Sequence, residues 1–394
     1  MHYRARSLNA PLIDFALKGL EKCWLPSEHR WSYIYHLDGR KQPNEIFPSK
    51  DIFYTLNVLL GMTRVDQIPL SVDLKSIFRR NVIRLLEYPV PKYAFGMALW
   101  TAAELNDELP QSVANHIQSM LADKRSWSTL TAQDLGMILI GVTAQAKNHA
   151  GFWSLLAAEL FDFLSEQFFC STNLFFNSPR GLRRRFSSFA TQTYLTLACY
   201  IYGEFAGNPA AVKMANSTTR KLLELQGPNG EWPWFFDVPH GIVSDFYEVY
   251  SVHQYGMAPA FLRYAERLGV PEARDATSKG FRWVFGENQM QRAMLLPASG
   301  LSIRSQVRRG EINTKAFRIG RSTYQSILGR SSNLADPASL QLRLECRSYE
   351  LGWILWSFGK RSDIPELTHH SIFTEQVKND RAASFDHYSA SQPA

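Results

Sequence analysis

The residues best suited to proton transfer are concentrated between positions 237 and 253. Carboxylates and imidazoles often act as general acids and bases, because their surroundings can tune their pKa values towards neutral pH. We predict catalytic roles for four of these side chains, namely Asp237, Asp245, Glu248 and His253. Three nearby aromatic residues are predicted to bind substrate, namely Trp234, Tyr247 and Tyr250.

The geometry of this stretch depends on where its helix begins. We predict a start near Asp245, which would place Tyr247 and Glu248 in the first turn and would put His253 and Gly256 on one face further along. Each polar residue also has a structural interpretation. Asp245 could be the N-cap, Glu248 a solvated carboxylate favoured by the helix dipole, and His253 a hydrogen-bonded core residue.

A second charged group precedes the last apolar helix. Glu345 and Arg347 flank Cys346, and they could place one carboxylate and one guanidinium at the mouth of a pocket. We therefore predict a catalytic role for Glu345 and a binding role for Arg347. A surface ion pair between the two explains the pattern equally well.

Further candidates for substrate binding lie elsewhere in the chain. Tyr35 and His36 belong to "YHLDGR", which could also be a simple turn, and Trp127 belongs to "SWSTLTAQD". Arg183 lies in an arginine run that could bind a carboxylate or phosphate, or could be a solvated loop.

This mixture of Tyr, Trp, Arg, Asp and His is suited to a sugar ligand. Aromatic faces stack on the apolar side of a sugar ring, while carboxylates and arginines hydrogen-bond its hydroxyls or a uronate. The sequence contains no G-x-S-x-G elbow, P-loop or dinucleotide-binding fingerprint. We expect a small-molecule or oligosaccharide substrate, with no metal and no cofactor.

Composition and charge argue against several other classes. The net charge is +7 and the pI is 9.1, but the arginines are spread along the chain and form no nucleic-acid-binding module. The 4 cysteines are far apart and lack CxxC spacing, which argues against a zinc site or a disulfide framework. We find neither a signal-peptide core nor an uninterrupted transmembrane stretch, and therefore expect a cytoplasmic protein.

The elements that must position these residues are mainly helices, because apolar residues recur at helical spacing through most of the chain. A small residue followed by a bulky one stands in the middle of six predicted helices, at Gly61-Met62, Gly96-Met97, Gly136-Met137, Ala198-Cys199, Gly256-Met257 and Gly352-Trp353. Predicted helices without this pair alternate with them, at residues 11–23, 72–86, 111–121, 152–168, 210–225 and 273–285.

Glycine inside a helix costs about 1 kcal/mol relative to alanine, so the repeated small residues require a packing reason. Close approach of helices around a closed ring supplies one. We therefore predict an all-α protein, an (α/α)6 toroid of about twelve helices, in preference to an open solenoid.

Strand-like alternation is confined to one region. "SGLSIRSQVRRG" and "AFRIGRSTYQSILG" flank "EINTK" and predict a β-hairpin inserted at about residues 296–330, before the last helix. We predict a single toroid domain over residues 1–360, followed by a loosely ordered polar tail over residues 361–394.

Residues 226–232, "QGPNGEW", match Q-x-x-x-G-x-W through Gln226, Gly230 and Trp232. The chain here resembles the α/α-toroid superfamily that includes terpenoid cyclases, and it also resembles the six-hairpin glycosidase-like proteins through "YSVHQYGMAPAFL" and "GFRWVFGEN". The motif itself predicts a clasp, with the glutamine at a helix end and the tryptophan packed back over it. The resemblance implies a pocket where loops enter the inner helices.

We expect a carbohydrate-active enzyme that acts on a saccharide by general acid–base catalysis, with an acidic saccharide as one option. A hydrolase would need two carboxylates across the pocket, whereas a lyase or epimerase would use Tyr, His and Arg around a uronate. One alternative is a terpenoid-cyclase-like enzyme, although the D-x-D-D and D-D-x-x-D motifs of cyclases are absent. A non-catalytic toroid that binds a glycan or a protein is the other.

Overall fold

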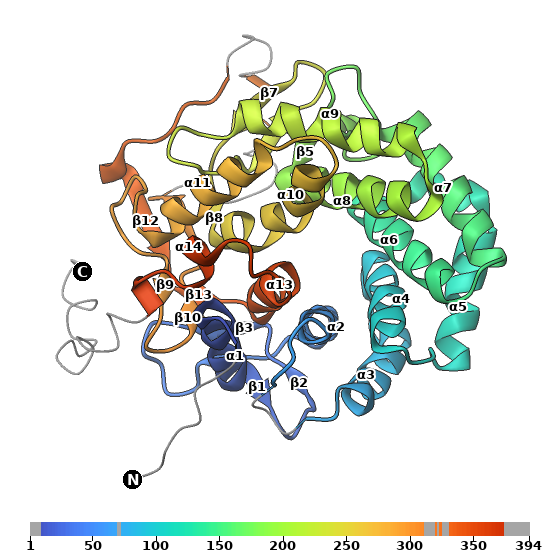
Figure 1. Ribbon diagram of the computed structural model, residues 1–394, viewed down its shortest axis with the longest axis horizontal. Coiled ribbons are helices and arrows are strands. Elements are labelled where there is room, and N and C mark those ends of the chain that lie inside the picture. The colour runs from blue at the N-terminus through green and yellow to red at the C-terminus, as the bar shows by residue number, and fades with distance from the viewer. Residues whose placement is uncertain (1–8, 69–71, 311–319, 321–322, 325–330, 374–394) are drawn as a thin grey trace.

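The computed structural model describes residues 9–68, 72–310, 320, 323–324 and 331–373. Two concentric rings of helices make up this part of the chain (Figure 1). The inner ring consists of α2 (Pro48–Met62), α4 (Tyr93–Leu105), α6 (Ala132–Asn148), α8 (Phe189–Ala206), α10 (Ala258–Arg267) and α13 (Ser348–Phe358). The outer ring consists of α1 (Pro11–Cys23), α3 (Leu74–Val82), α5 (Gln111–Ala122), α7 (Phe152–Phe168), α9 (Pro209–Leu225) and α11 (Ala273–Phe285).

The inner ring is closed. Each inner helix packs against the next one along the chain, and α13 packs against α2, so the last inner helix meets the first. The prediction of an (α/α)6 toroid is confirmed. Five of the inner helices carry the small-bulky pairs, and the sixth pair, Gly256-Met257, lies in the π-helical turn His253–Met257 directly before α10.

Burial distinguishes the two rings. In α2, every residue from Asp51 to Met62 is buried, whereas α9 buries Ala211, Ala215, Thr218, Thr219 and Leu222 at helical spacing and exposes most of its other face. The inner helices thus lie between the centre of the ring and the outer layer. None of the described helices is long and apolar enough to cross a membrane.

The small residues of the inner ring allow backbones to approach closely. A Cβ atom at Gly61 would overlap the carbonyl of Gly352, and one at Gly96 would overlap the backbone of Met137. These contacts join α2 to α13 and α4 to α6. The packing reason predicted for the mid-helix glycines is therefore confirmed at these two contacts.

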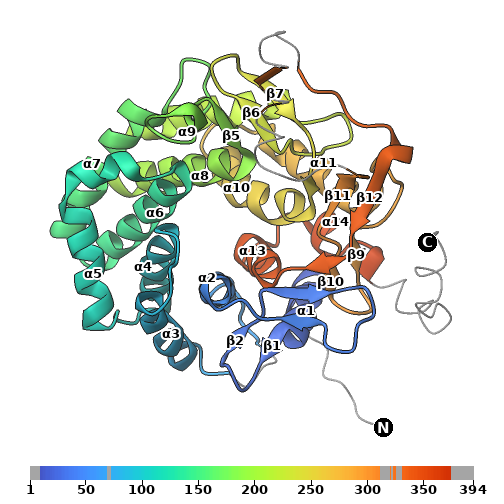
Figure 2. The ribbon, with the colours of Figure 1, turned by 180° about the vertical axis from the view of Figure 1, so that it is seen from behind.

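Short strands join the ends of the helices on the face seen in Figure 2. Three sheets matter for the site: β5–β6–β7, β8–β11–β12 and β4–β3–β13. Their strands are β3 (Ile34–His36), β4 (Asn44–Glu45), β5 (Phe186–Ser188), β6 (Phe235–Asp237), β7 (Ile242–Asp245), β8 (Val249–Tyr250), β11 (Ser305–Arg308), β12 (Leu340–Arg343) and β13 (Glu345–Cys346). The remaining pairs are β1 (Trp24–Leu25) with β2 (Arg30–Trp31) and β9 (Leu295–Leu296) with β10 (Leu301–Ser302).

The region predicted as a β-hairpin is arranged differently where the structure describes it. Its first arm forms β10 and β11, but β11 pairs with β12 on one side and β8 on the other. Most of the expected second arm and the connecting "EINTK" lie outside the described residues. Long-range pairing replaces the local hairpin partner that the alternating pattern suggested.

The turn after α9 joins two helical hairpins. The Gln226 side-chain amide donates hydrogen bonds to the carbonyls of Gly230, at 2.9 Å, and Ala276 in α11, at 3.2 Å. Trp232 is fully buried and stacks on Phe189 at the start of α8, with ring centroids 5.2 Å apart. The tryptophan therefore packs on the inner ring.

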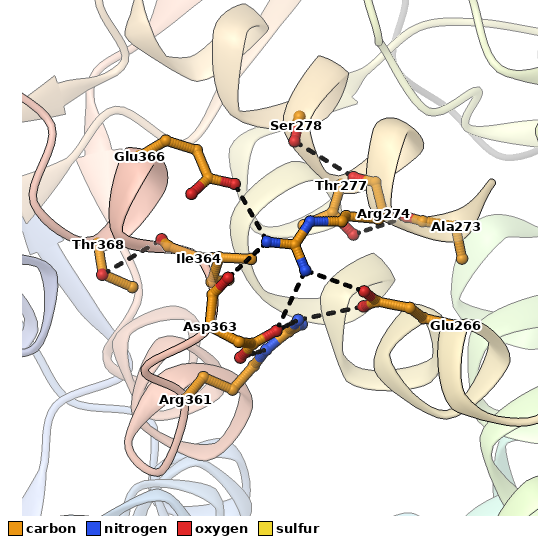
Figure 3. A network of polar contacts seen from close by, with 10 residues as sticks. All are labelled: Glu266, Ala273, Arg274, Thr277, Ser278, Arg361, Asp363, Ile364, Glu366 and Thr368. Carbon is orange, nitrogen blue, oxygen red and sulfur yellow. Dashed lines mark hydrogen bonds and ion pairs between the residues drawn. The ribbon is translucent and has the colours of Figure 1, made fainter. Parts of the chain in front are cut away.

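A charged cluster attaches the chain that follows α13. Arg274 of α11 and Arg361 both bind Glu266 of α10, at 3.1 Å each, and both also contact Asp363 (Figure 3). The short helix α14 (Pro365–Thr368) follows and packs against α1. The described chain therefore continues past residue 360, the predicted end of the domain, through α14 to residue 373. Residues 374–394 of the predicted tail lie outside the described residues.

Candidate active site

A cavity of about 180 Å³ lies where the chain enters the inner helices. It is lined by Phe53, Tyr54, Tyr93, Gln133, Ala190, Tyr194, Trp234, Tyr250, His253, Met257, Arg304 and Tyr349. Every inner helix contributes, α10 through the π-helical turn that precedes it (His253–Met257). The N-terminal ends of these helices carry partial positive charge, so the cavity favours a negatively charged group.

Tyrosine hydroxyls give the cavity hydrogen-bonding groups that a ligand could use. The hydroxyls of Tyr54, Tyr93 and Tyr349 have no hydrogen-bond partner among the described residues. Burial raises the pKa of Tyr93 to about 12, and burial also raises the pKa values of Tyr54 and Tyr349. All three are therefore protonated at neutral pH and can donate a hydrogen bond or a proton.

His253 lies among aromatic rings at one side of the cavity. It is 3% exposed, with the ring centroid of Phe189 at 4.7 Å and that of Tyr250 at 5.1 Å. Burial, with a contribution from the charge of Arg304, lowers the pKa of His253 to about 3. The imidazole is consequently neutral, and its Nδ1 atom has no partner among the described residues.

Arg304 brings a positive charge to the cavity wall. Its Nη1 donates to Glu350 at 2.7 Å, its Nε lies 3.0 Å from Glu345, and its guanidinium carbon lies 4.9 Å from the ring centroid of Tyr250. The side chain is 12% exposed. A guanidinium held in this way can bind a carboxylate without having to be ordered first.

Glu350 lies behind Arg304 and is fully buried. Its Oε2 accepts hydrogen bonds from the hydroxyl of Tyr255, at 3.1 Å, and that of Ser302, at 3.4 Å. Burial raises the pKa of Glu350 to about 7, against the opposing effect of Arg304. This carboxyl group therefore titrates near neutral pH although it does not line the cavity.

Three of the predicted catalytic carboxylates lie outside the cavity wall and bind arginines. Asp237 binds Arg185 through both oxygens at 3.0 Å and His240 at 2.9 Å. Asp245 lies 3.0 Å from Arg308, and Glu248 lies 3.0 Å from Arg343. All three carboxylates are buried.

The predicted helix start at Asp245 is wrong. Asp245 ends β7, and Glu248 immediately precedes β8. Helical structure begins only at Ser251. Pairing of β6 with β7 and of β8 with β11 holds this stretch in extended form, so neither the N-cap nor the first-turn interpretation applies.

The remaining predicted residues are divided between the wall, its surroundings and more distant positions. Trp234, Tyr250 and His253 line the cavity together, whereas Tyr247 contacts Arg308 and receives a hydrogen bond from the Ala335 amide. Glu345 and Arg347 form a partly buried pair at 2.7 Å, and Arg347 lies 4.0 Å from the ring centroid of Tyr33.

Four other predictions fall outside the wall. Tyr35 pairs with Asn44 and Cys346 in a sheet, and His36 binds Glu45 at 2.7 Å. Trp127 is buried against Phe163 of the outer helix α7, and Arg183 is exposed. None of these four lines the cavity in the described structure.

Sequence reasoning included His253 but missed three wall residues that carry the same signal. Three positions before Gly96, Gly136, Gly256 and Gly352 stand Tyr93, Gln133, His253 and Tyr349, and all four line the cavity. The glycine marks the contact between inner helices, and the residue about one turn earlier faces the cavity. No such glycine precedes or follows Arg304 at this spacing. Its position is set by β11, the strand that follows it, which pairs with β8 and β12.

No protein-family model matches the sequence, and no curated protein is similar to it in sequence. Solved structures do share the fold. The α-1,6-mannanase of Salegentibacter sp. HEL1_6 gives a TM-score of 0.56 at 10% identity, over 89% of this chain and 98% of its own. An unsaturated glucuronyl hydrolase from Bacillus sp. GL1, described as responsible for glycosaminoglycan degradation, gives a TM-score of 0.51 at 13% identity. That match covers 88% of this chain and 94% of the hydrolase.

A sugar epimerase from a ruminal bacterium is also similar, with a TM-score of 0.52 at 9% identity, over 70% of this chain and 84% of that one. At these identities the likeness concerns the fold. The described residues contain no group of three His, Cys, Asp or Glu side chains placed to hold a metal ion. The chain shares the (α/α)6 toroid fold with these solved structures.

Proposed function

We propose that the protein is a carbohydrate-active enzyme that binds an acidic saccharide and removes the proton on the carbon next to its carboxylate. This step is common to uronate lyases and to epimerases that act beside a carboxylate. The observation that carries the proposal is that Arg304, neutral His253 and several tyrosine hydroxyls line one cavity. The fold is shared with enzymes whose names include a glucuronyl hydrolase and a sugar epimerase.

Charge supports an anionic substrate. Arg304 is the charged group in the described wall, and the N-terminal ends of the inner helices add positive potential. Arg304 would partly neutralise the negative charge of a bound carboxylate. This would stabilise the carbanion formed on the adjacent carbon and make its C–H bond more acidic. The rings of Trp234 and Tyr250 offer surfaces for the apolar side of the sugar.

His253 is the base that we propose, and a tyrosine is the proposed acid. A neutral imidazole can accept a proton, and a bound anion nearby would raise its basicity by stabilising the imidazolium. In an elimination, the proton passes to His253, the C–H electrons form the new double bond, and the departing sugar oxygen takes a proton from a tyrosine hydroxyl. In an epimerisation, a proton returns to the same carbon from the opposite face.

Hydrolysis by two carboxylates is less well supported. None of the described wall residues is Asp or Glu, and Asp237, Asp245 and Glu248 bind arginines outside it. The mannanase with this fold is described as inactive when two aspartates are replaced by asparagine. A terpenoid-cyclase-like reaction is also disfavoured, because the cavity contains an arginine and many hydroxyls.

We also propose a cytoplasmic location. Cys23, Cys170, Cys199 and Cys346 are all buried with free thiols. A reducing compartment keeps thiols in this state.

The test is incubation with paired saccharides that differ only in the acidic group, such as oligoglucuronates and the corresponding neutral oligoglucosides. Unsaturated uronate absorbance would report elimination, and deuterium uptake from heavy water without chain cleavage would report epimerisation. We expect one of these signals with the acidic member alone, and expect its loss in His253→Gln. New reducing ends without unsaturation would overturn the proposed chemistry, and binding without turnover would support the non-catalytic alternative.

A further inference from the structure

We propose that Glu350 positions Arg304 from behind the cavity and takes up a proton when an anionic saccharide binds. The inference rests on the proposed function in one respect, namely that the ligand carries a negative charge beside Arg304. It assigns a role to a residue that does not line the cavity and does not touch the substrate.

The first part follows from the contacts of the guanidinium. Nη1 of Arg304 donates a hydrogen bond to Glu350 at 2.7 Å, Nε lies 3.0 Å from a carboxylate oxygen of Glu345, and Tyr250 covers the group. The Nη2 atom takes part in neither contact, and Arg304 lines the cavity wall, so Nη2 is the atom that we assign to the ligand. The short contacts to Glu350 and Glu345 restrain the guanidinium and, with it, the direction in which Nη2 points.

The second part follows from the charge balance of the buried network. Arg304 and Arg347 carry two positive charges, and Glu345 and Glu350 carry two negative charges when ionised. A bound anion would leave this network with one excess negative charge. Burying an unbalanced charge is costly, and protonation of a carboxylate is the usual way to avoid that cost.

Glu350 is better placed than Glu345 to accept the proton. Glu350 is fully buried, whereas the Glu345 side chain is 13% exposed and binds Arg347 as well as Arg304. The surroundings of Glu350 tolerate both states, because the Tyr255 and Ser302 hydroxyls can donate to a carboxylate or accept from a carboxylic acid. Burial also raises the pKa of Glu350 to about 7, so protonation near neutral pH costs little.

The other titratable neighbours do not replace it in this role. Arg304 and Arg347 stay charged, and Tyr255 and Tyr349 have raised pKa values and remain neutral. Cys346 beside Ser302 and Cys23 at the end of α1 are buried thiols, whose pKa values are raised by burial. Around neutral pH, Glu350 is the group of this cluster whose charge can change.

The test is titration calorimetry of the full-length protein with D-glucuronate, using D-glucose as the uncharged comparison. Repeating the titration in two buffers with different ionisation enthalpies gives the number of protons taken up. We expect uptake approaching one proton at pH 8 and little at pH 6, where Glu350 is already protonated. The dissociation constant should rise by up to about tenfold per pH unit above pH 7.

Glu350→Gln mimics the protonated state. This variant should bind glucuronate at pH 8 about as tightly as the wild type does at pH 6, with no proton uptake. Tyr255→Phe removes one donor to the ionised carboxylate and should move the uptake to higher pH, which supplies a second test if Glu350→Gln does not fold. Glu231→Gln is the matched control, because burial also raises the pKa of Glu231, which binds Gln289 at 2.8 Å outside this cluster.

The outcomes separate the two proposals. Glucuronate binding without proton uptake, or uptake unchanged in Glu350→Gln, overturns the role of Glu350 and leaves the acidic ligand intact. No glucuronate binding at any pH overturns the acidic ligand and, with it, this inference. Proton uptake on binding glucose would also contradict the inference, since no anion would be present to cause it.

Discussion

The rings of Trp234 and His253 are nearly parallel, with an angle of 6° between their planes and 6.2 Å between their centroids. The indole helps to cover the imidazole at the cavity, and burial is the main reason that the pKa of His253 is low. The two residues come from different elements, Trp234 from the loop before β6 and His253 from the π-helical turn before α10. The pKa of His253 therefore depends on whether the loop before β6 keeps Trp234 in its position over the imidazole.

Trp234→Ala should raise the pKa of His253 from about 3 towards 6.5, because water would reach the imidazole. An NMR titration of the His253 ring would measure this change. Trp127→Ala is the control, since Trp127 is a buried tryptophan that packs on the outer helix α7 and does not line the cavity. An unchanged His253 pKa in Trp234→Ala would show that the other aromatic rings are sufficient to exclude water from the imidazole.

His253 should also make stability depend on pH. Its pKa falls from 6.5 to about 3 on folding, so between these values the unfolded chain binds a proton that the folded chain does not. Stability contributed by the neutral imidazole is therefore present above pH 6.5 and is lost as pH falls towards 3. The slope is at most about 1.4 kcal/mol per pH unit.

Glu350 contributes with the opposite sign, because its pKa rises from 4.5 to about 7 on folding, and its contribution is lost as pH rises through that range. Urea unfolding of the wild type alone would mix the two effects. The informative quantity is the wild-type free energy of unfolding minus that of His253→Gln. It should decrease from pH 6 to pH 4; a constant difference would contradict the low pKa of His253.

Gly61→Ala should destabilise the protein by about 1–3 kcal/mol, because the new methyl group would overlap the carbonyl of Gly352 in a packed core. Gly280→Ala in the outer helix α11 is the matched control. The nearest atom to its Cβ would lie at 3.3 Å, and the gain in helix propensity offsets the small adjustment. Equal unfolding midpoints for the two variants would argue against close packing of α2 on α13.

Asp237→Asn should lower the free energy of unfolding by about 1–3 kcal/mol, because the fully buried side chain would lose its charge-assisted bonds to Arg185. Asp38→Asn disrupts an exposed pair with Arg40 and should have no measurable effect on unfolding. Thermal unfolding would compare the two. Full stability of Asp237→Asn with complete loss of turnover would return Asp237 to a catalytic role.

The ring was predictable from the sequence because it depends on local features. Helical periodicity placed α7 at residues 152–168 and α11 at residues 273–285, and the structure has the same bounds. The mid-helix glycines then indicated which helices were internal. Gly61 and Gly352 are far apart in the chain, but each had already been identified from its own helix.

The site was less predictable because its charges depend on distant partners. Asp237 finds Arg185 at a separation of 52 residues, and Asp245 finds Arg308 at 63. No local pattern reveals that a carboxylate will meet an arginine from another strand. His253 lines the cavity one helical turn before Gly256, so a local pattern marks its position, whereas the position of Arg304 depends on β11 pairing with β8 and β12.

The contact between α2 and α13 also determines when the cavity can form during synthesis. Phe53 and Tyr54 leave the ribosome first, but Arg304 and Tyr349, on the same wall, follow about 250 and about 295 residues later. Until α13 emerges, α2 lacks a neighbour on one side, and Gly61 has no backbone to pack against. A nascent chain that stops before residue 348 therefore has five sixths of a ring, an open apolar seam and no completed site.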